Sequence, residues 1–124
     1  MRRSFTLTIA AVALLLGLTA CSSTGASAPG SVEVGAETIL LDVRTAEEYA
    51  DGHLEGAELL DFNAGDVAAA IPQLDADAEY LVYCRSGNRS GQAIALLEEA
   101  GFTHLTDLGS LEQAAQATAL SVVN

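Results

Sequence analysis

Short apolar runs alternate with amphipathic stretches along most of the chain. Four apolar runs have the length and composition of buried strands, and they cover residues 37–43, 56–62, 79–83 and 102–108. Helical patterns lie between and after these runs, at residues 45–51, 66–71, 90–100 and 111–118. A last apolar segment, 120–123, is consistent with an edge strand. This alternation predicts an α/β fold with a mostly parallel sheet flanked by helices.

Local signals mark the ends of several predicted helices. The sequence "TAEE" at 45–48 has the spacing of a capping box, and the helix that it opens stops near Gly52. Pro72 ends the second helix, because proline cannot continue the hydrogen-bonded ladder. Gly101 follows the apolar stripe of 90–100, where a C-terminal cap belongs.

Residues 1–20 have the organisation of an export signal. Two arginines precede the apolar stretch 9–18, which is shorter than the roughly 20 residues that a membrane-spanning helix needs. The sequence "LTAC" at 18–21 resembles a bacterial lipobox. This resemblance implies that Cys21 is lipidated and becomes the first residue of the mature chain. An ordinary secretory signal that is cleaved nearby is the alternative, and the export route stays open.

The segment after Cys21 is small and polar. The sequence "SSTGASAPGS" at 22–31 cannot bury a core, so we expect a flexible linker. The predicted organisation is a lipoprotein signal peptide (1–20), the lipidated cysteine with its linker (21–31) and one domain (32–124). We expect the domain to be exported and anchored to the cell membrane through Cys21, on the extracytoplasmic side.

The charge of the chain limits its partners. Without residues 1–20, three arginines face 17 acidic residues, which gives a net charge of −14. No basic stripe is available to neutralise phosphates, so the composition argues against nucleic acid. It also argues against electrostatic docking on anionic lipid, which leaves the lipid anchor as the expected membrane contact. We expect a well-solvated monomer.

Cys84 has no intramolecular partner if Cys21 is lipidated. It directly follows the predicted strand 79–83, and "RSGNR" then leads into the helix 90–100. Ligands bind such sheets at the carboxyl ends of strands, where loop N–H groups and a helix dipole attract anions. The same field favours a thiolate. The sequence therefore predicts a nucleophilic thiolate in an anion cradle, and the alternative is a buried cysteine that acts as a small hydrophobe.

Two motifs resemble the signatures of the rhodanese-type sulfurtransferases. The first is "CRSGNRSGQA" at 84–93, which is similar to the active-site loop of that family, and the second is "LLDVRTAEEYADGHLEGA" at 40–57. The resemblance extends over roughly residues 38–111 and implies a three-layer rhodanese-like fold.

The resemblance also implies an activity. Cys84 would take a sulfane sulfur from a small anionic donor such as thiosulfate and form a persulfide. Cyanide in an assay, or a thiol in the cell, would then remove the sulfur, and a protein thiol is an expected partner. The implied binding loop, with guanidinium groups that draw in the anion, consists of Arg85, Ser86, Gly87, Asn88, Arg89 and Ser90. No metal and no organic cofactor are implied.

Two other functions are compatible with parts of this pattern. A tyrosine-phosphatase loop has arginine six positions after its cysteine, but that position is Ser90 and the arginine is Arg89. The shorter loop suits a sulfur atom better than a phosphate group. A persulfide carrier or thiol-relay module with little thiosulfate activity is the stronger alternative.

The remaining candidate residues have mainly structural interpretations. Asp42 and Arg44 follow the first strand and are expected on the same side of the sheet as Cys84, where they would support the loop through hydrogen bonds and ion pairs. His53 is expected to be a hydrogen-bonded structural histidine. Glu47 and Glu48 are interpreted as charges at the start of a helix.

Overall fold

The computed structural model describes residues 30–124. The predicted signal peptide, Cys21 and most of the predicted linker lie outside the described residues. None of the helices within residues 30–124 combines the length and the apolar composition that a membrane-spanning segment requires.

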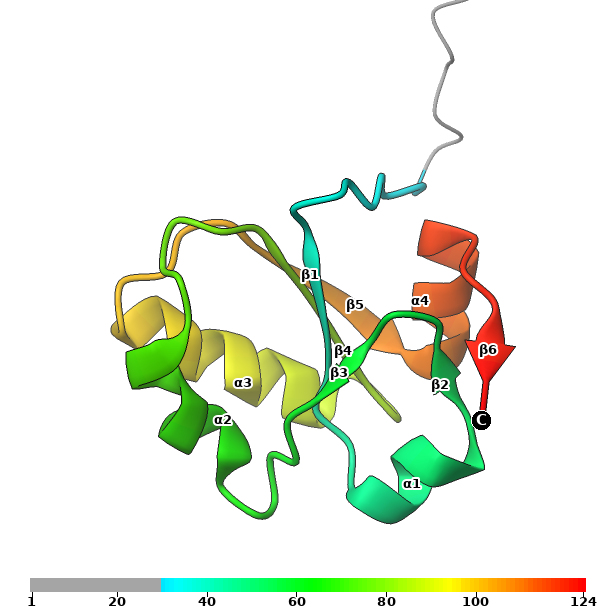
Figure 1. Cartoon of the computed structure of the whole chain (residues 1–124), viewed down its shortest axis with the longest axis horizontal. Helices are drawn as coiled ribbons and strands as arrows, with labels where there is room; N and C mark the ends of the chain where they lie inside the picture. Colours follow the sequence, from blue (N-terminus) through cyan, green and yellow to red (C-terminus); the bar gives the residue numbers. More distant parts are fainter. Residues whose placement is uncertain (1–29) are drawn as a thin grey trace, which may run out of the picture.

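Four parallel strands form the main sheet, with the spatial order β3-β1-β4-β5 (Figure 1). These strands are β1 (Ile39–Asp42), β3 (Glu58–Leu59), β4 (Tyr80–Cys84) and β5 (Leu105–Ser110). A separate antiparallel pair joins β2 (His53–Leu54) to β6 (Val122–Val123). The carboxyl ends of the parallel strands therefore meet at one edge of the sheet, which is where the predicted loop begins.

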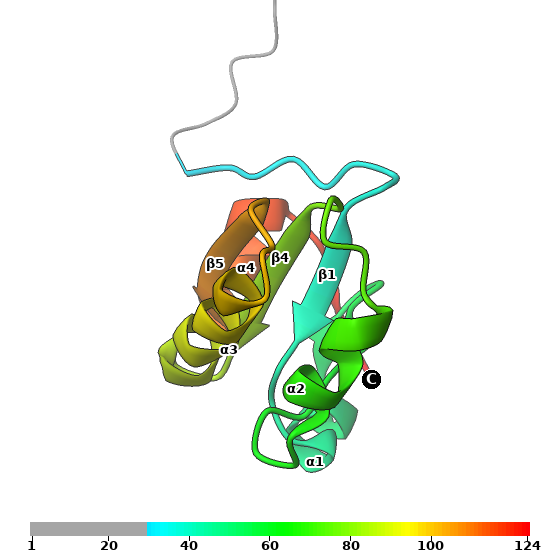
Figure 2. The ribbon, with the colours of Figure 1, turned by 90° about the vertical axis from the view of Figure 1, so that its left-hand side faces the viewer.

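Helices cover both faces of the sheet. On one face lie α2 (Asp66–Ala70), continued by a 3-10 turn (Ile71–Gln73), and α3 (Asn88–Glu99). On the other face lie α1 (Ala46–Asp51) and α4 (Leu111–Thr118). Figure 2 turns the first pair toward the viewer and the second pair behind the sheet. This arrangement confirms the predicted α/β class with a mostly parallel sheet flanked by helices.

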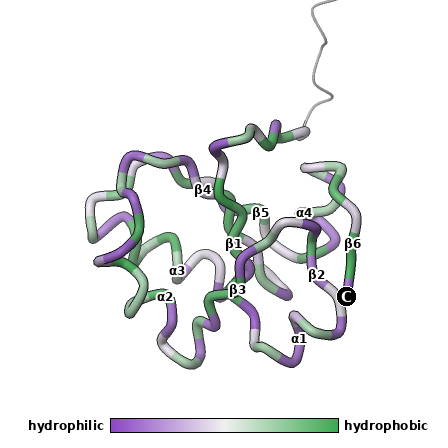
Figure 3. The backbone as a smooth tube through the Cα atoms, in the orientation of Figure 1, coloured by the Kyte–Doolittle hydropathy of each residue, from purple (hydrophilic) through white to green (hydrophobic). Residues whose placement is uncertain are grey.

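The central strand β4 contributes side chains to the hydrophobic cores on both faces of the sheet. All five of its residues are buried, and successive side chains point to opposite faces. Tyr80, Val82 and Cys84 enter the core under α2 and α3, whereas Leu81 and Tyr83 enter the core under α1 and α4. In Figure 3 the hydrophobic colouring accordingly concentrates on the strands at the centre of the molecule.

Several predicted boundaries differ from the structure. The strand expected at 56–62 is only Glu58–Leu59, and the one expected at 102–108 is β5, which begins three residues later. The helix expected at 90–100 begins at Asn88, because Gly87 ends the loop in a left-handed conformation. The C-terminal segment is a strand as expected, but it pairs with β2 and not with the main sheet.

Candidate active site

Cys84 is the last residue of β4 and is fully buried. Its side chain lies on the face covered by α3, and only the loop 85–87 separates it from the first residue of that helix. The strand register places it beside Ser110, the residue that caps α4. The thiol therefore lies at the carboxyl edge of the sheet, below the N-terminal end of α3.

The loop and the helix both contribute groups that contact the sulfur. The backbone N–H of Gly87 donates to Cys84 Sγ at 2.9 Å, and Ser90 Oγ lies 3.5 Å from the same atom. The Ser90 hydroxyl donates to the carbonyl oxygen of Gly87 at 3.1 Å, so it accepts from the thiol when Cys84 is protonated. When Cys84 ionises, the Ser90 hydroxyl can turn its proton to the sulfur. One hydroxyl thus serves both protonation states.

These contacts change the acidity of the thiol. Burial raises the pKa of Cys84, because it disfavours the charged form. Hydrogen bonds from the Ser90 hydroxyl and from the backbone N–H groups of Ser90, Ser86 and Gly87 outweigh burial, and the pKa of Cys84 is lowered overall. A buried sulfur with a lowered pKa and several donors around it is suited to nucleophilic attack.

Gly87 allows the loop to close over the sulfur. Its φ is +90°, in the left-handed region that residues with a Cβ rarely adopt. It also occupies the N-cap of α3, where no side chain caps the helix. The N–H groups of the first turn are consequently available to an anionic sulfur, and the helix dipole also stabilises a negative charge at this end of the helix.

The two loop arginines differ in their partners. Arg89 makes a bidentate ion pair with Glu48 of α1, with Nη1–Oε2 and Nη2–Oε1 distances of 2.8 and 3.0 Å. Arg85 is far more exposed and reaches Glu48 Oε1 only at 4.0 Å. The hydrogen bonds from Arg89 lower the pKa of Glu48 to about 2, and those to Glu48 raise the pKa of Arg89. The loop therefore carries one neutralised guanidinium and one that is nearly free.

A buried network lies on the opposite face. Arg44 Nε and Nη2 donate to the two carboxylate oxygens of Asp42 at 2.9 and 2.6 Å, and Nη2 also donates to the Gly52 carbonyl at 2.6 Å. The Tyr83 hydroxyl donates to Asp42 Oδ2 at 2.7 Å and accepts from the backbone N–H of Leu54 at 3.0 Å. The network ties β1 and β4 to the turn between α1 and β2.

This network corrects one expectation. Asp42 lies at the same edge of the sheet as Cys84, but its side chain contacts Tyr83 on the opposite face. Arg44 forms the expected ion pair and fixes the turn at Gly52. The hydroxyl of Tyr83, which precedes Cys84 in β4, is the contact that joins Asp42 to this strand.

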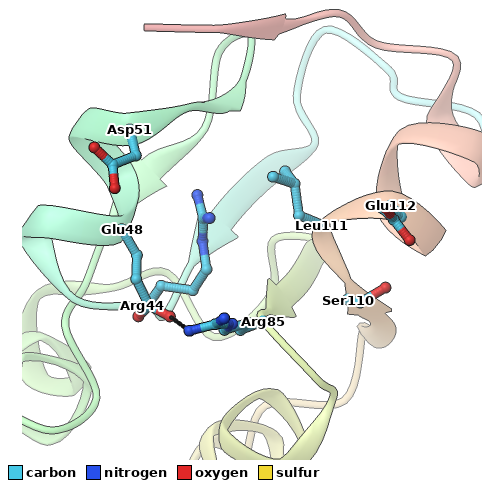
Figure 4. Close-up of a pocket in the computed structure, with 7 residues that line it drawn as sticks. All are labelled: Arg44, Glu48, Asp51, Arg85, Ser110, Leu111 and Glu112. Atoms are coloured by element: carbon cyan, nitrogen blue, oxygen red, sulfur yellow. Dashed lines mark ion pairs between the residues drawn. The ribbon is translucent and has the colours of Figure 1, made fainter.

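A cavity of about 410 Å³ opens between α1 and α4, next to the loop (Figure 4). Its lining residues are Arg44, Glu48, Asp51, Arg85, Ser110, Leu111 and Glu112. Figure 4 shows Arg85 at one end of the cavity with its ion pair to Glu48, and shows α4 opposite α1. Arg85 is the residue of the loop 85–90 that lines the cavity.

The side chains of the remaining candidates contact groups other than the sulfur. Asn88 begins α3, and its Oδ1 accepts from Gln92 Nε2 at 2.6 Å. His53 Nδ1 lies 3.0 Å from the carbonyl oxygen of Tyr49, and the two rings stack with centroids 3.6 Å apart. His53 is therefore held by its neighbour, as a structural histidine would be. Within residues 30–124, no group of three or more histidine, cysteine or acidic residues could hold a metal ion.

Glu48 and Tyr83 are the residues that sequence reasoning missed. The sequence indicates only a helix-start charge at Glu48. Glu48 does serve the capping box with Thr45, but it also binds Arg89, 41 positions along the chain. For Tyr83 the sequence indicates only a place in a strand. Its place immediately before Cys84, at the end of a strand, was the one available signal.

Comparison with known proteins assigns the family. The sequence profile of the rhodanese-like domain matches residues 30–116, more than half of the chain. The chain therefore belongs to the rhodanese-like family, as its two motifs predict. It is 36% identical over 87 residues to Thiosulfate sulfurtransferase PspE of Escherichia coli strain K12, and the alignment covers 68% of this chain and 82% of that protein.

Solved structures give the same result for the fold. A rhodanese-like domain from an Anabaena protein is 30% identical with a TM-score of 0.61, and the match covers 70% of this chain and 99% of that one. A rhodanese with anions from E. coli is 32% identical with a TM-score of 0.57, and the match covers 70% and 98% of the two chains. The roles of Cys84 and of its loop residues stay predictions.

Proposed function

We propose that the protein is a sulfurtransferase that moves a sulfane sulfur from a thiosulfate-like donor to a thiophilic acceptor through a persulfide on Cys84. The observation that carries this proposal is the sulfur of Cys84, which receives a hydrogen bond from Gly87 N–H at 2.9 Å at the uncapped start of α3. This arrangement stabilises a thiolate and then a persulfide, both of which are anions.

The proposed first half-reaction is a displacement at sulfur. The Cys84 thiolate attacks the outer sulfur of thiosulfate and forms an S–S bond, while the S–S bond of the donor breaks and sulfite leaves with the electron pair. The persulfide anion takes the place of the thiolate under the N–H groups of the loop. In the second half-reaction, a cyanide or thiolate acceptor attacks the terminal sulfur and Cys84 leaves as the thiolate.

Thiosulfate is proposed as a donor because a relative, PspE, is a thiosulfate sulfurtransferase by name. The geometry adds support, because the loop offers backbone N–H groups and Arg85 as a partly free cation at the cavity. No metal or organic cofactor takes part in either proposed half-reaction.

The test compares wild type with Cys84→Ser. Treatment with thiosulfate is expected to add one sulfur atom to wild type by intact mass, and cyanide is expected to remove it as thiocyanate. Cys84→Ser should show neither change, since the less nucleophilic hydroxyl forms no persulfide. The proposal is wrong if wild type and Cys84→Ser give equal mass spectra and equal thiocyanate formation.

We also propose that the domain acts outside the cytoplasm on a lipid anchor at Cys21. The basic pair, the apolar stretch and "LTAC" support this location. In membrane fractionation, wild type is expected with the membrane and Cys21→Ala in the soluble exported fraction. Equal fractionation of the two would refute the anchor and leave the sulfur chemistry untouched.

A further inference from the structure

The described domain has few cations near Cys84. Residues 30–124 contain three arginines and no lysine. Asp42 holds Arg44 in the buried network with two paired hydrogen bonds, and Glu48 holds Arg89 in the same bidentate manner. Arg85 is the exception, because 79% of its side chain is exposed and its one ion pair, to Glu48, is 4.0 Å long.

Glu48 is placed so that its charge acts on both arginines of the loop. Its two oxygens face both loop arginines, and it lines the cavity beside Arg85. The ion pair with Arg89 lowers the pKa of Glu48 to about 2, so the carboxylate is ionised throughout the physiological range. The two guanidinium groups and this carboxylate together carry a single net positive charge.

From this arrangement we propose that Glu48 determines donor specificity: it limits the loop to one effective positive charge and thereby favours singly charged sulfur donors over doubly charged ones. This inference rests on the proposed sulfur transfer, and it identifies the class of donor. The preferred donors would be monoanions such as thiosulfonates or persulfides that carry one charge, and thiosulfate would be a usable but weaker donor.

The walls of the cavity also disfavour doubly charged donors. Asp51 on α1 and Glu112 on α4 line the cavity, and neither has an ion-pair partner among the described residues. An incoming dianion meets these carboxylates and the Cys84 thiolate with only one guanidinium that is nearly free. A monoanion is repelled about half as strongly, because the Coulomb energy is proportional to its charge.

Two donors that react by the same chemistry but differ in charge can test this inference. Thiosulfate is a dianion and methanethiosulfonate is a monoanion, and each presents a terminal sulfur bonded to an oxidised sulfur. In both reactions the Cys84 thiolate forms an S–S bond to that terminal sulfur. The donor S–S bond breaks, and the leaving group takes the electron pair as sulfite or as methanesulfinate. Atoms and charges balance in the same way, so a difference in kcat/KM between the two donors reflects their charge and shape.

The experiment measures kcat/KM for both donors in wild type, Glu48→Gln and Glu47→Gln. Glutamine at position 48 keeps an oxygen that can accept from Thr45 N–H, so the cap of α1 is preserved while the charge is lost. Glu47 is the matched control, because it is the adjacent exposed carboxylate and has no ion pair among residues 30–124. Both variants change the net charge of the protein equally.

We expect Glu48→Gln to raise kcat/KM for thiosulfate by roughly fourfold more than for methanethiosulfonate, the effect of one extra unit charge acting across a solvated pocket. The difference should shrink as salt is added, because salt screens exposed charges. Glu47→Gln should leave the ratio between donors unchanged. Arg85→Gln, at an exposed side chain, should move the ratio in the opposite direction.

The binding of unreactive anions tests the inference without any transfer of sulfur. Amide shifts of Gly87 and Ser90 can follow titration with sulfate, a dianion, and with methanesulfonate, a monoanion. Glu48→Gln should tighten sulfate binding more than methanesulfonate binding. Equal changes for both anions and both donors would overturn the inference. A wild type that binds anions selectively but transfers no sulfur would instead refute the proposed function.

Discussion

The domain contains two bidentate arginine–carboxylate pairs, and they lie in different surroundings. The Arg44–Asp42 pair is almost fully buried, with 6% and 0% of the two side chains exposed. The Arg89–Glu48 pair is at the rim of the site, with 19% and 22% exposed. Their hydrogen-bond distances are similar, so the difference between them is one of environment.

Environment decides what each pair can do. Asp42 has no exposed surface and Arg44 has very little, so each charge depends on its partner and on the Tyr83 and Gly52 contacts. Glu48 and Arg89 remain partly hydrated, and their separation costs far less. The buried pair therefore fixes architecture, whereas the rim pair sets the charge that a substrate meets.

The largest effect is expected from Asp42→Asn. This change leaves the buried guanidinium of Arg44 without a counter-charge, which should lower the free energy of unfolding by about 3–5 kcal/mol. Glu48→Gln serves as the control at the rim pair, and it should lower that free energy by about 1 kcal/mol or less. Urea denaturation of both variants measures the two losses. Equal losses would show that the two pairs do not differ as their burial indicates.

A smaller loss is expected from Tyr83→Phe. The change removes only the hydroxyl that donates to Asp42 and accepts from Leu54 N–H, and it leaves both charges of the buried pair in place. The expected decrease in the free energy of unfolding is about 1–3 kcal/mol, the range for a buried group that loses its partner. The same denaturation experiment measures it. A loss as large as that of Asp42→Asn would mean that the hydroxyl, and not the ion pair, holds the network together.

The two pairs also differ in how far the sequence predicts them. Asp42 and Arg44 are two residues apart at the end of a recognisable strand, and their pairing could be expected. The face of the sheet on which Asp42 lies could not be predicted. The strand β1 is buried on both sides, so its apolar run has no alternation of polar and apolar residues that would show which side chains point to which face. Glu48 and Arg89 are 41 residues apart, and only the folding of the chain brings α1 and the start of α3 to the same edge of the sheet.

The helices and strands also differ in whether local sequence signals or tertiary contacts determine them. The helix at 111–118 has the predicted bounds, because its cap at Ser110 and its amphipathic pattern are local. The strand β4 was predicted within one residue from its apolar run. The two-residue strands β2 and β6 are too short to have a periodic signal. Their pairing follows from the return of the chain after α4, which brings Ser121 within hydrogen-bond distance of Glu55.

The smallest expected effect is the acid sensitivity of the rim pair. The pKa of Glu48 is lowered from 4.5 to about 2 in the folded protein, so its ion pair contributes stability above pH 4.5 and loses it as the pH falls toward 2. The stability difference between wild type and Glu48→Gln, about 1 kcal/mol or less at neutral pH, should therefore vanish in this acid range. Urea unfolding at a series of pH values measures it, with Glu47→Gln to account for general effects of charge. A difference that stays constant from neutral pH down to 2 would mean that Glu48 stabilises the domain through its helix cap, which glutamine shares only in part, and not through its charge.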